Sequence, residues 1–328
     1  MAAGIILTFF IACVASYLGG LFPLIGGPIF AILIGIILAN IWGRPAWAEQ
    51  GLNFTGKKIL QWSIIALGGS LSFEQVLQTG LDSLSIMIFT LSSALVSAYF
   101  FGRMMRIPWR LNTLVGVGTA ICGGSAIAAI SPVIEAEDDE IAYAISTIFF
   151  FNILAAFSFP ILGHLLGFSD QGFGLWAGTA INDTSSVVAA GYAFSSTAGD
   201  YATIVKMTRT TMIIPICFVA AILMTKHKAK NAVEGKVNCS LVKIFPWFIL
   251  GFLGLSIANT MGLFNSTVAH GFGNLGKFMI IMALAAIGYK ADLKKMFSAG
   301  VKPILLGFII WFVVSVVAFA VQFFTGRM

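Results

Sequence analysis

Long runs of apolar residues recur along almost the whole chain, separated by short polar segments. A helix needs about 20 such residues to cross the ~30 Å hydrocarbon core of a bilayer. Eleven runs approach or exceed this length, at 4–20, 22–42, 58–73, 83–103, 111–133, 139–166, 173–195, 202–225, 243–262, 273–290 and 301–325. They do not alternate between apolar and polar residues as the strands of membrane barrels do. The pattern therefore predicts an all-α polytopic membrane protein with about eleven transmembrane helices.

The composition excludes a water-soluble globular protein. Of the 328 residues, 59% are apolar and 10% are charged, whereas about a quarter of the residues in a soluble domain are charged. The connections are too short for a soluble domain, so residues 1–328 are expected to form a single transmembrane domain. No basic residue precedes the first run and a second follows at once, which predicts that the first helix is retained rather than cleaved as a signal peptide.

The basic residues predict an orientation. With a cytoplasmic N-terminus, eleven spans place the C-terminus outside, and cytoplasmic loops should collect Lys and Arg. The loops so assigned hold most of the 19 basic residues: Arg44, Lys57, Lys58, Arg103, Arg106, Arg110, Lys226, Lys228, Lys230, Lys236, Lys243, Lys290, Lys294, Lys295 and Lys302. Lys277 and Arg327 fall on the other side. The formal charge of +6 is then a topology signal, and no nucleic-acid partner is expected because the cations flank spans.

The acidic residues are expected on the outer side. Glu74 and Asp82 precede the fourth span, and four further acids cluster with Glu135 at 135–140. Such a run is typical of a hydrated loop. The alternative is that it attracts cations to an outer opening.

Two spans are interrupted by glycine and polar residues at mid-depth. Both contain Gly-Thr-Ala-Ile, at 118–121 and 178–181, an offset of 60 residues. These segments predict helix breaks near 122–125 and 182–186, because irregular backbone at this depth is tolerated where it lines a cavity. The alternative is that small residues let helices pack closely. The candidate site residues on the two segments are Thr119, Cys122, Gly123, Gly124, Ser125, Thr179, Asn182, Thr184 and Ser185.

Asp183 lies about ten residues into the seventh span, or roughly 15 Å along a helix. A carboxylate near the bilayer centre costs about 2.5–3.5 kcal/mol and usually marks a functional site. Asp183 is therefore a candidate for binding an ion, a proton or the substrate. The alternative is a structural ion pair.

Lys206 and Arg209 lie three residues apart on one face of the eighth span. Two buried cations beside one buried acid leave a positive surplus, which suits an anionic substrate held by the guanidinium group. The alternative is that the pair extends to the interface or clamps Asp183.

A second similarity, at an offset of 220 residues, relates Gly56-Lys57, Gly68 and Gly80 to Gly276-Lys277, Gly288 and Gly300. It accompanies two apolar runs, 59–67 and 278–287, that are too short to cross alone. Inverted repeats of about 22–166 and 173–325 are one interpretation. The sequence leaves open which pair of broken helices cross.

No nucleotide-binding phosphate loop is present in the sequence, and no metal or cofactor motif is recognised. His164 is expected at the cytoplasmic end of the sixth span, while His227 and His270 are in loops. A membrane-embedded hydrolase would need a general base beside its nucleophile, so we do not expect an enzyme. Four scattered cysteines predict no disulfide framework.

The three motifs at 118–126, 178–186 and 206–210 resemble those of the YeiH-type family of bacterial inner-membrane proteins. The resemblance covers nearly the whole chain. It implies a secondary carrier of ten or eleven spans, similar in build to cation/proton antiporters and bile-acid symporters, with two crossed broken helices. It also implies sulfate or small sulfonates as exported substrates.

Together these features predict a proton- or ion-coupled carrier of a small anion. Lys206 and Arg209 would hold the oxyanion, the broken segments would donate hydrogen bonds, and Asp183 would accept a proton or a cation. One alternative is a sodium/proton exchanger in which Asp183 binds the cation and the basic pair is structural. Another is a channel or a non-transporting membrane subunit. A homo-oligomer is compatible with each.

Overall fold

The computed structural model describes residues 1–22, 26–43, 45–230, 246–291 and 300–328. Within these ranges all regular secondary structure is helical. Six helices are long and apolar enough to cross a membrane, and shorter apolar helices lie at Gly26–Trp42, Gly124–Ile134 and Phe248–Thr260. The predicted all-helical polytopic membrane protein is thus supported. Two of the eleven expected spans, at 111–133 and 173–195, are not continuous helices.

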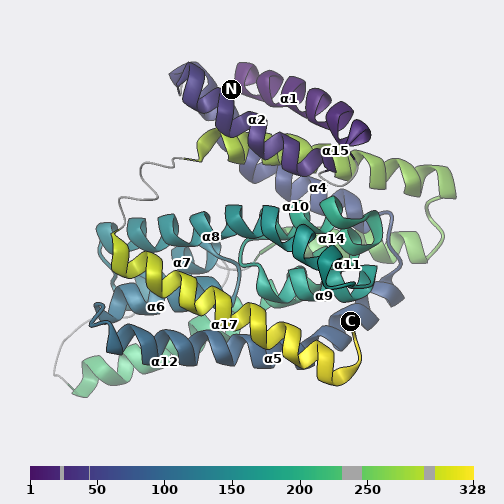
Figure 1. The fold of residues 1–328 in the computed structure, drawn as a ribbon. Coiled ribbons are helices and arrows are strands. Elements are labelled where there is room, and N and C mark those ends of the chain that lie inside the picture. The colour runs from purple at the N-terminus through teal and green to yellow at the C-terminus, as the bar shows by residue number, and fades with distance from the viewer. Residues whose placement is uncertain (23–25, 44, 231–245, 292–299) are drawn as a thin grey trace.

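The helices form two layers (Figure 1). The panel layer consists of α1 (Ala2–Leu21), α2 (Gly26–Trp42), α3 (Ala46–Phe54), the π-helical turn η1 (Thr55–Ile59), α4 (Leu60–Gly68) and α15 (Ser266–Lys290). The hairpin layer consists of α5 (Phe73–Met104), α6 (Trp109–Ala120), α7 (Gly124–Ile134), α8 (Asp138–Leu165), α9 (Asp170–Ala180), α10 (Thr184–Phe194), α11 (Ser196–Thr211), α12 (Ile213–Lys230) and α17 (Val301–Thr325). Helix α14 (Phe248–Thr260) packs on α4 and α5, beside both layers.

Close approach of backbones holds the panel layer together. A Cβ atom on Gly288 would lie 2.3 Å from the carbonyl oxygen of Ile32, so α15 can approach α2 only with glycine here. Of the glycines in the 220-residue similarity, Gly276 and Gly288 therefore serve helix packing in this layer, and Gly68 lets α4 approach α14. The runs 59–67 and 278–287 are not isolated short spans, as the sequence suggested. Each is part of a longer helical segment, α3–η1–α4 or the 25-residue α15.

The predicted fifth span does not cross. Helices α6 and α7 form a hairpin, because Arg110 at its start and Glu137 just beyond its end form an ion pair with an N–O distance of 3.6 Å. A straight helix would separate these residues by roughly 40 Å. The chain reverses at Gly123, whose φ of +67° is a conformation that favours glycine.

The predicted seventh span is a hairpin as well. The rings of Phe173 on α9 and Phe194 on α10 stack with centroids 4.0 Å apart, whereas a straight helix would separate them by roughly 30 Å. Helix α8 joins the two hairpins and has 28 residues, enough to span about 40 Å. The hairpins therefore enter from opposite sides, and their tips meet in the middle of the layer.

These reversals change the predicted distribution of charge. The acidic run at 135–140 lies on the same side as Arg110 rather than on the opposite side, because Glu137 pairs with Arg110. Consequently α8 runs in the opposite direction to the predicted sixth span, and His164 lies at the opposite end from the one expected. Glu74 and Asp82 lie within α5 rather than in a loop. Five of the basic residues used for orientation fall outside the described ranges: Arg44, Lys236, Lys243, Lys294 and Lys295.

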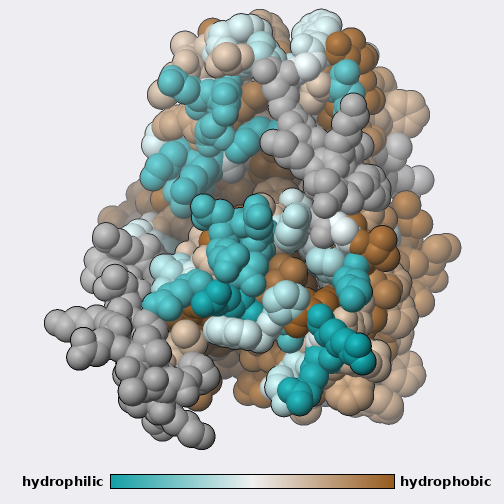
Figure 2. Space-filling view, turned by 90° about the vertical axis from the view of Figure 1, so that its left-hand side faces the viewer, coloured by the Kyte–Doolittle hydropathy of each residue, from teal (hydrophilic) through white to brown (hydrophobic). Residues whose placement is uncertain are grey.

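We call the side that carries Lys57, Arg110 and Lys290 the basic face. The opposite face carries the C-terminus, where Arg327 lies 3.9 Å from the carboxylate of Asp82. Figure 2 looks onto the basic face, whose centre is hydrophilic and hollowed between the two layers.

Candidate functional site

The two hairpin tips touch. A Cβ atom built on Gly123 would lie 3.6 Å from the Cβ atom of Asp183. The main-chain N–H of Asp183 donates to Asn152 Oδ1 of α8 at 3.2 Å. The breaks that the sequence predicted at mid-depth are therefore present, at 121–123 and 181–183, and they are adjacent in space.

Lys206 on α11 binds both tips. Its ammonium group donates to the carbonyl oxygen of Ile121 at 2.7 Å and to that of Ile181 at 3.1 Å. The side chain is completely buried. Ile121 and Ile181 are equivalent residues under the 60-residue offset, so one cation recognises the same position of both repeated motifs.

Arg209 lies one turn further along α11 and also binds carbonyl groups of both repeated motifs. Its guanidinium group donates to the carbonyl oxygens of Thr119 at 2.8 Å and of Ala120 at 2.7 Å, and also to that of Thr179. Thr119 and Thr179 are again equivalent under the offset. Arg209 is also completely buried.

The two cations therefore cap the C-terminal ends of α6 and α9. The last carbonyl groups of a helix lack partners and carry a partial negative charge, which a cation stabilises. The sequence predicted correctly that Lys206 and Arg209 lie deep and turn inward. It assigned their nitrogen atoms to an oxyanion, whereas the structure places them on backbone carbonyl groups. Neither cation lies within 4.0 Å of a carboxylate among the described residues, so the alternative of a clamp on Asp183 is not observed either.

Asp183 is the N-cap of α10. Its carboxylate accepts the main-chain N–H of Ser185 at 3.0 Å and the Ser185 hydroxyl group as well. The side chain is half-buried. An ionised carboxylate at this position is stabilised by the N-terminal end of the helix dipole.

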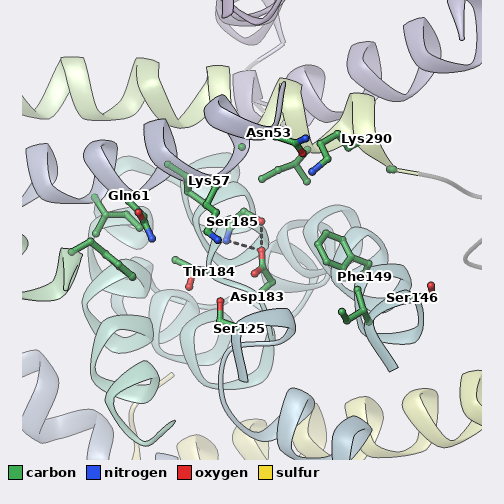
Figure 3. A pocket seen from close by; sticks show the side chains of 17 residues that line it. Asn53, Lys57, Gln61, Ser125, Ser146, Phe149, Asp183, Thr184, Ser185 and Lys290 are labelled. Atoms are coloured by element: carbon green, nitrogen blue, oxygen red, sulfur yellow. Dashed lines mark hydrogen bonds between the residues drawn. The ribbon is translucent and has the colours of Figure 1, made fainter. Parts of the chain in front are cut away.

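A cavity of about 670 Å³ lies between the two layers. The hairpin layer contributes Ser125 from the first tip and Asp183, Thr184 and Ser185 from the second (Figure 3). The panel layer contributes residues of α3, η1, α4 and α15, including Asn53, Lys57, Gln61 and Lys290. The N-terminal ends of α7 and α10 thus face the cavity, while the capped C-terminal ends of α6 and α9 lie behind it.

Comparison with known proteins identifies the family. The family described as Conserved hypothetical protein 698 matches residues 3–307. A UPF0324 membrane protein of Clostridium tetani is 45% identical over 337 residues, covering 99% of this chain and 98% of the relative. Another, from Streptococcus pyogenes, is 46% identical over 331 residues, covering 98% and 97%. The chain belongs to the UPF0324 membrane protein family. The resemblance to the YeiH-type family is thereby confirmed.

In this UPF0324 protein the predicted site residues divide into two groups. Those at the cavity are Ser125, Asp183, Thr184 and Ser185. Those buried behind it are Thr119, Cys122, Thr179, Asn182, Lys206 and Arg209, while Gly123 and Gly124 shape the first tip. The amide group of Asn182 has no hydrogen-bond partner within the described ranges, which is costly for a buried polar group.

Lys57 and Lys290 were missed as candidates for the site. In the sequence both resemble loop lysines whose position indicates only the orientation of the chain. Lys57 lies in η1, and Lys290 is the last residue of α15. The recurrence of Gly-Lys at 56–57 and 276–277 was the sequence feature nearest to this lining, but it did not distinguish a cavity from a loop.

Proposed function

We propose that this UPF0324 protein is a secondary carrier that exports a small anion across the bacterial inner membrane, coupled to a proton or cation at Asp183. The observation that carries the proposal is the meeting of two hairpin tips at a cavity between two layers of helices. Discontinuous helices that aim their ends at a central site are the usual construction of secondary transporters.

The electrostatics of the tips favour an anion. The helix ends that face the cavity are the N-termini of α7 and α10, which carry partial positive charge. Ser125 and Thr184 add hydroxyl donors. The negative ends of α6 and α9 are already neutralised by Lys206 and Arg209, so they do not offset this polarity.

A contact between the layers near the opposite face favours a carrier over a channel. There the ammonium group of Lys277 on α15 lies 5.3 Å from the ring centroid of Tyr192 on α10. The Tyr192 hydroxyl group donates to Asp200 on α11. We call these three residues the interlayer latch, because they join the two layers. Lys277 lies roughly 20 Å along α15 from Lys290. Access from one side at a time is what alternating access requires.

The family resemblance suggests sulfate or a small sulfonate as the substrate. Asp183 is the one carboxylate among the lining residues within the described part of the chain. It would accept a proton or cation as the anion binds or leaves, which couples the two fluxes. The buried amide of Asn182, beside it in the chain, would supply a further polar group to the coupling ion.

Purified protein in proteoliposomes tests this proposal. We expect saturable uptake of labelled sulfate or methanesulfonate, driven above equilibrium by an imposed proton or sodium gradient. Asp183→Asn keeps a good N-cap for α10 but removes the ionisable group, so gradient-driven accumulation should be lost.

Asp170→Asn is the matched control, because Asp170 is an exposed acid in the first turn of α9, away from the cavity. It should accumulate substrate as the wild type does. Accumulation that persists in Asp183→Asn would refute the coupling role. Conductance that does not saturate would indicate a channel instead.

A further inference from the structure

The cavity has a charged part that the panel layer supplies. Lys57 and Lys290 are the two cations among the described residues that line it, beside the carboxylate of Asp183. No carboxylate of the described residues lies within 4.0 Å of either ammonium group. The formal charges of these described lining residues therefore sum to +1 when Asp183 is ionised, before the helix ends are considered.

The local fold directs Lys57 into the cavity. Its helix widens into a π-helical turn at Thr55–Ile59, a rare distortion that is often found at functional sites. In Figure 3 the Lys57 side chain extends toward Asp183 and Ser185. Lys57 and Lys58 are both exposed, but Lys58 does not line the cavity.

Much of the rest of the wall is apolar. Seven of the described lining side chains are hydrocarbon or aromatic, contributed by both layers, by α14 and by the residue after α15: Leu60, Ile64, Ile145, Phe149, Phe248, Ile287 and Ala291. The volume of about 670 Å³ lies in the range of about 300–1,000 Å³ that holds organic ligands. An inorganic anion would leave the apolar side chains of this wall without van der Waals contacts to the ligand.

We propose that Lys57 and Lys290 bind the acidic head of an organic monoanion, a sulfonate or carboxylate, whose apolar body packs on the wall that includes Phe149. This inference rests on the proposed function and narrows its substrate class. A single negative charge matches the sum of +1 over the described lining residues. The ammonium groups come from the panel layer, and the hydroxyl groups of Ser125 and Thr184 come from the hairpin layer. The substrate would thus be held between the two layers.

Ligand binding to the purified protein in detergent tests this inference, with hexanesulfonate, methanesulfonate and sulfate as probes. Hexanesulfonate should bind the wild type at least about tenfold more tightly than methanesulfonate, because each buried methylene group contributes. Sulfate should bind more weakly than hexanesulfonate. Phe149→Ala should weaken hexanesulfonate binding and leave methanesulfonate binding unchanged.

Lys57→Gln and Lys290→Gln should each raise the Kd for hexanesulfonate about tenfold or more, as expected for loss of a hydrogen bond to a charged group. Lys57→Arg should retain most of the affinity. Lys58→Gln and Lys302→Gln remove exposed charges outside the lining and should bind as the wild type does. Unchanged melting temperatures without ligand would show that the variants fold.

The outcomes separate the two proposals. If none of the probes binds or is transported, the proposed function fails. If the sulfonates bind and Lys57→Gln behaves like Lys58→Gln, this inference fails while the carrier remains. Equal binding of sulfate and hexanesulfonate would overturn the assignment of an organic substrate.

Discussion

At the scale of single residues, Lys206 and Arg209 show how a membrane protein stabilises buried cations without acids. Five hydrogen bonds connect the two side chains to carbonyl groups at the ends of α6 and α9. Each bond satisfies a carbonyl oxygen that a helix terminus leaves without a partner. The cations and the helix ends therefore stabilise one another, and both hairpin tips are fixed by one turn of α11.

Arg209→Lys should destabilise the protein although the charge is kept. A lysine cannot reproduce the three-way contact of the guanidinium group, so two buried carbonyl groups lose their donor at a cost of about 1–3 kcal/mol each. The free energy of unfolding should fall by at least about 2 kcal/mol, measured as a lower midpoint of denaturation in detergent. Arg103→Lys, at an exposed position on α5, is the control. Equal midpoints for the two variants would contradict the capping role.

At the scale of helices, the sequence predicted the breaks but not their consequence. The glycines and polar residues near 122 and 182 indicated interrupted helices, because side-chain composition controls local helix stability. An apolar run of some 23 residues looks the same whether the chain continues or turns back at its middle. The reversal depends on one backbone conformation, at Gly123, and on a contact such as Arg110–Glu137 between residues that are distant in sequence. Neither the conformation of one residue nor a contact between distant residues can be recognised from the spacing of apolar residues along the sequence.

Thiol labelling of single cysteines tests the first hairpin. In a background without the four native cysteines, a cysteine replacing Glu137 should react with an impermeant reagent from the same side as one replacing Lys58. A cysteine replacing Asp170 should react from the other side, because α8 separates the hairpins. Labelling of the Glu137 and Lys58 positions from opposite sides would support the straight fifth span and refute the hairpin.

The sequence predicted those site residues that are charged and lie within an apolar span. Asp183, Lys206 and Arg209 were found because buried charge is costly and therefore rare. Their partners were not found, since main-chain carbonyl groups belong to every residue. Lys57 and Lys290 resembled ordinary loop lysines, and only the packing of one layer against the other places them at a cavity.

At the scale of the whole molecule, the two layers meet at a cavity on the basic face and at the interlayer latch near the opposite face. Each layer carries part of both contacts. Residues of α15 take part in each, with Lys290 at the cavity and Lys277 at the latch. A relative movement of the layers that closes one contact would therefore strain the other, which is the behaviour that alternating access requires.

Lys277→Gln should weaken the latch. Removing a cation–π contact of about 1 kcal/mol should increase the population open on the opposite face about fivefold. A cysteine replacing Ser125 would report this as faster labelling from that face. Lys302→Gln removes a charge outside the latch and should leave the labelling rate unchanged. Identical rates in the two variants would exclude the latch as a closing contact.

The panel layer combines helices from distant parts of the chain. Its first helices end at Gly68, and α15 begins at Ser266, so about 200 residues are translated in between, which takes roughly 10–40 s at typical ribosome speeds. During that interval the close-packing faces of α2 and α4 lack their partner α15, while the hairpin layer except α17 is inserted. Completion of the cavity is therefore one of the last events of biosynthesis, and a nascent chain released before α15 has no such compartment.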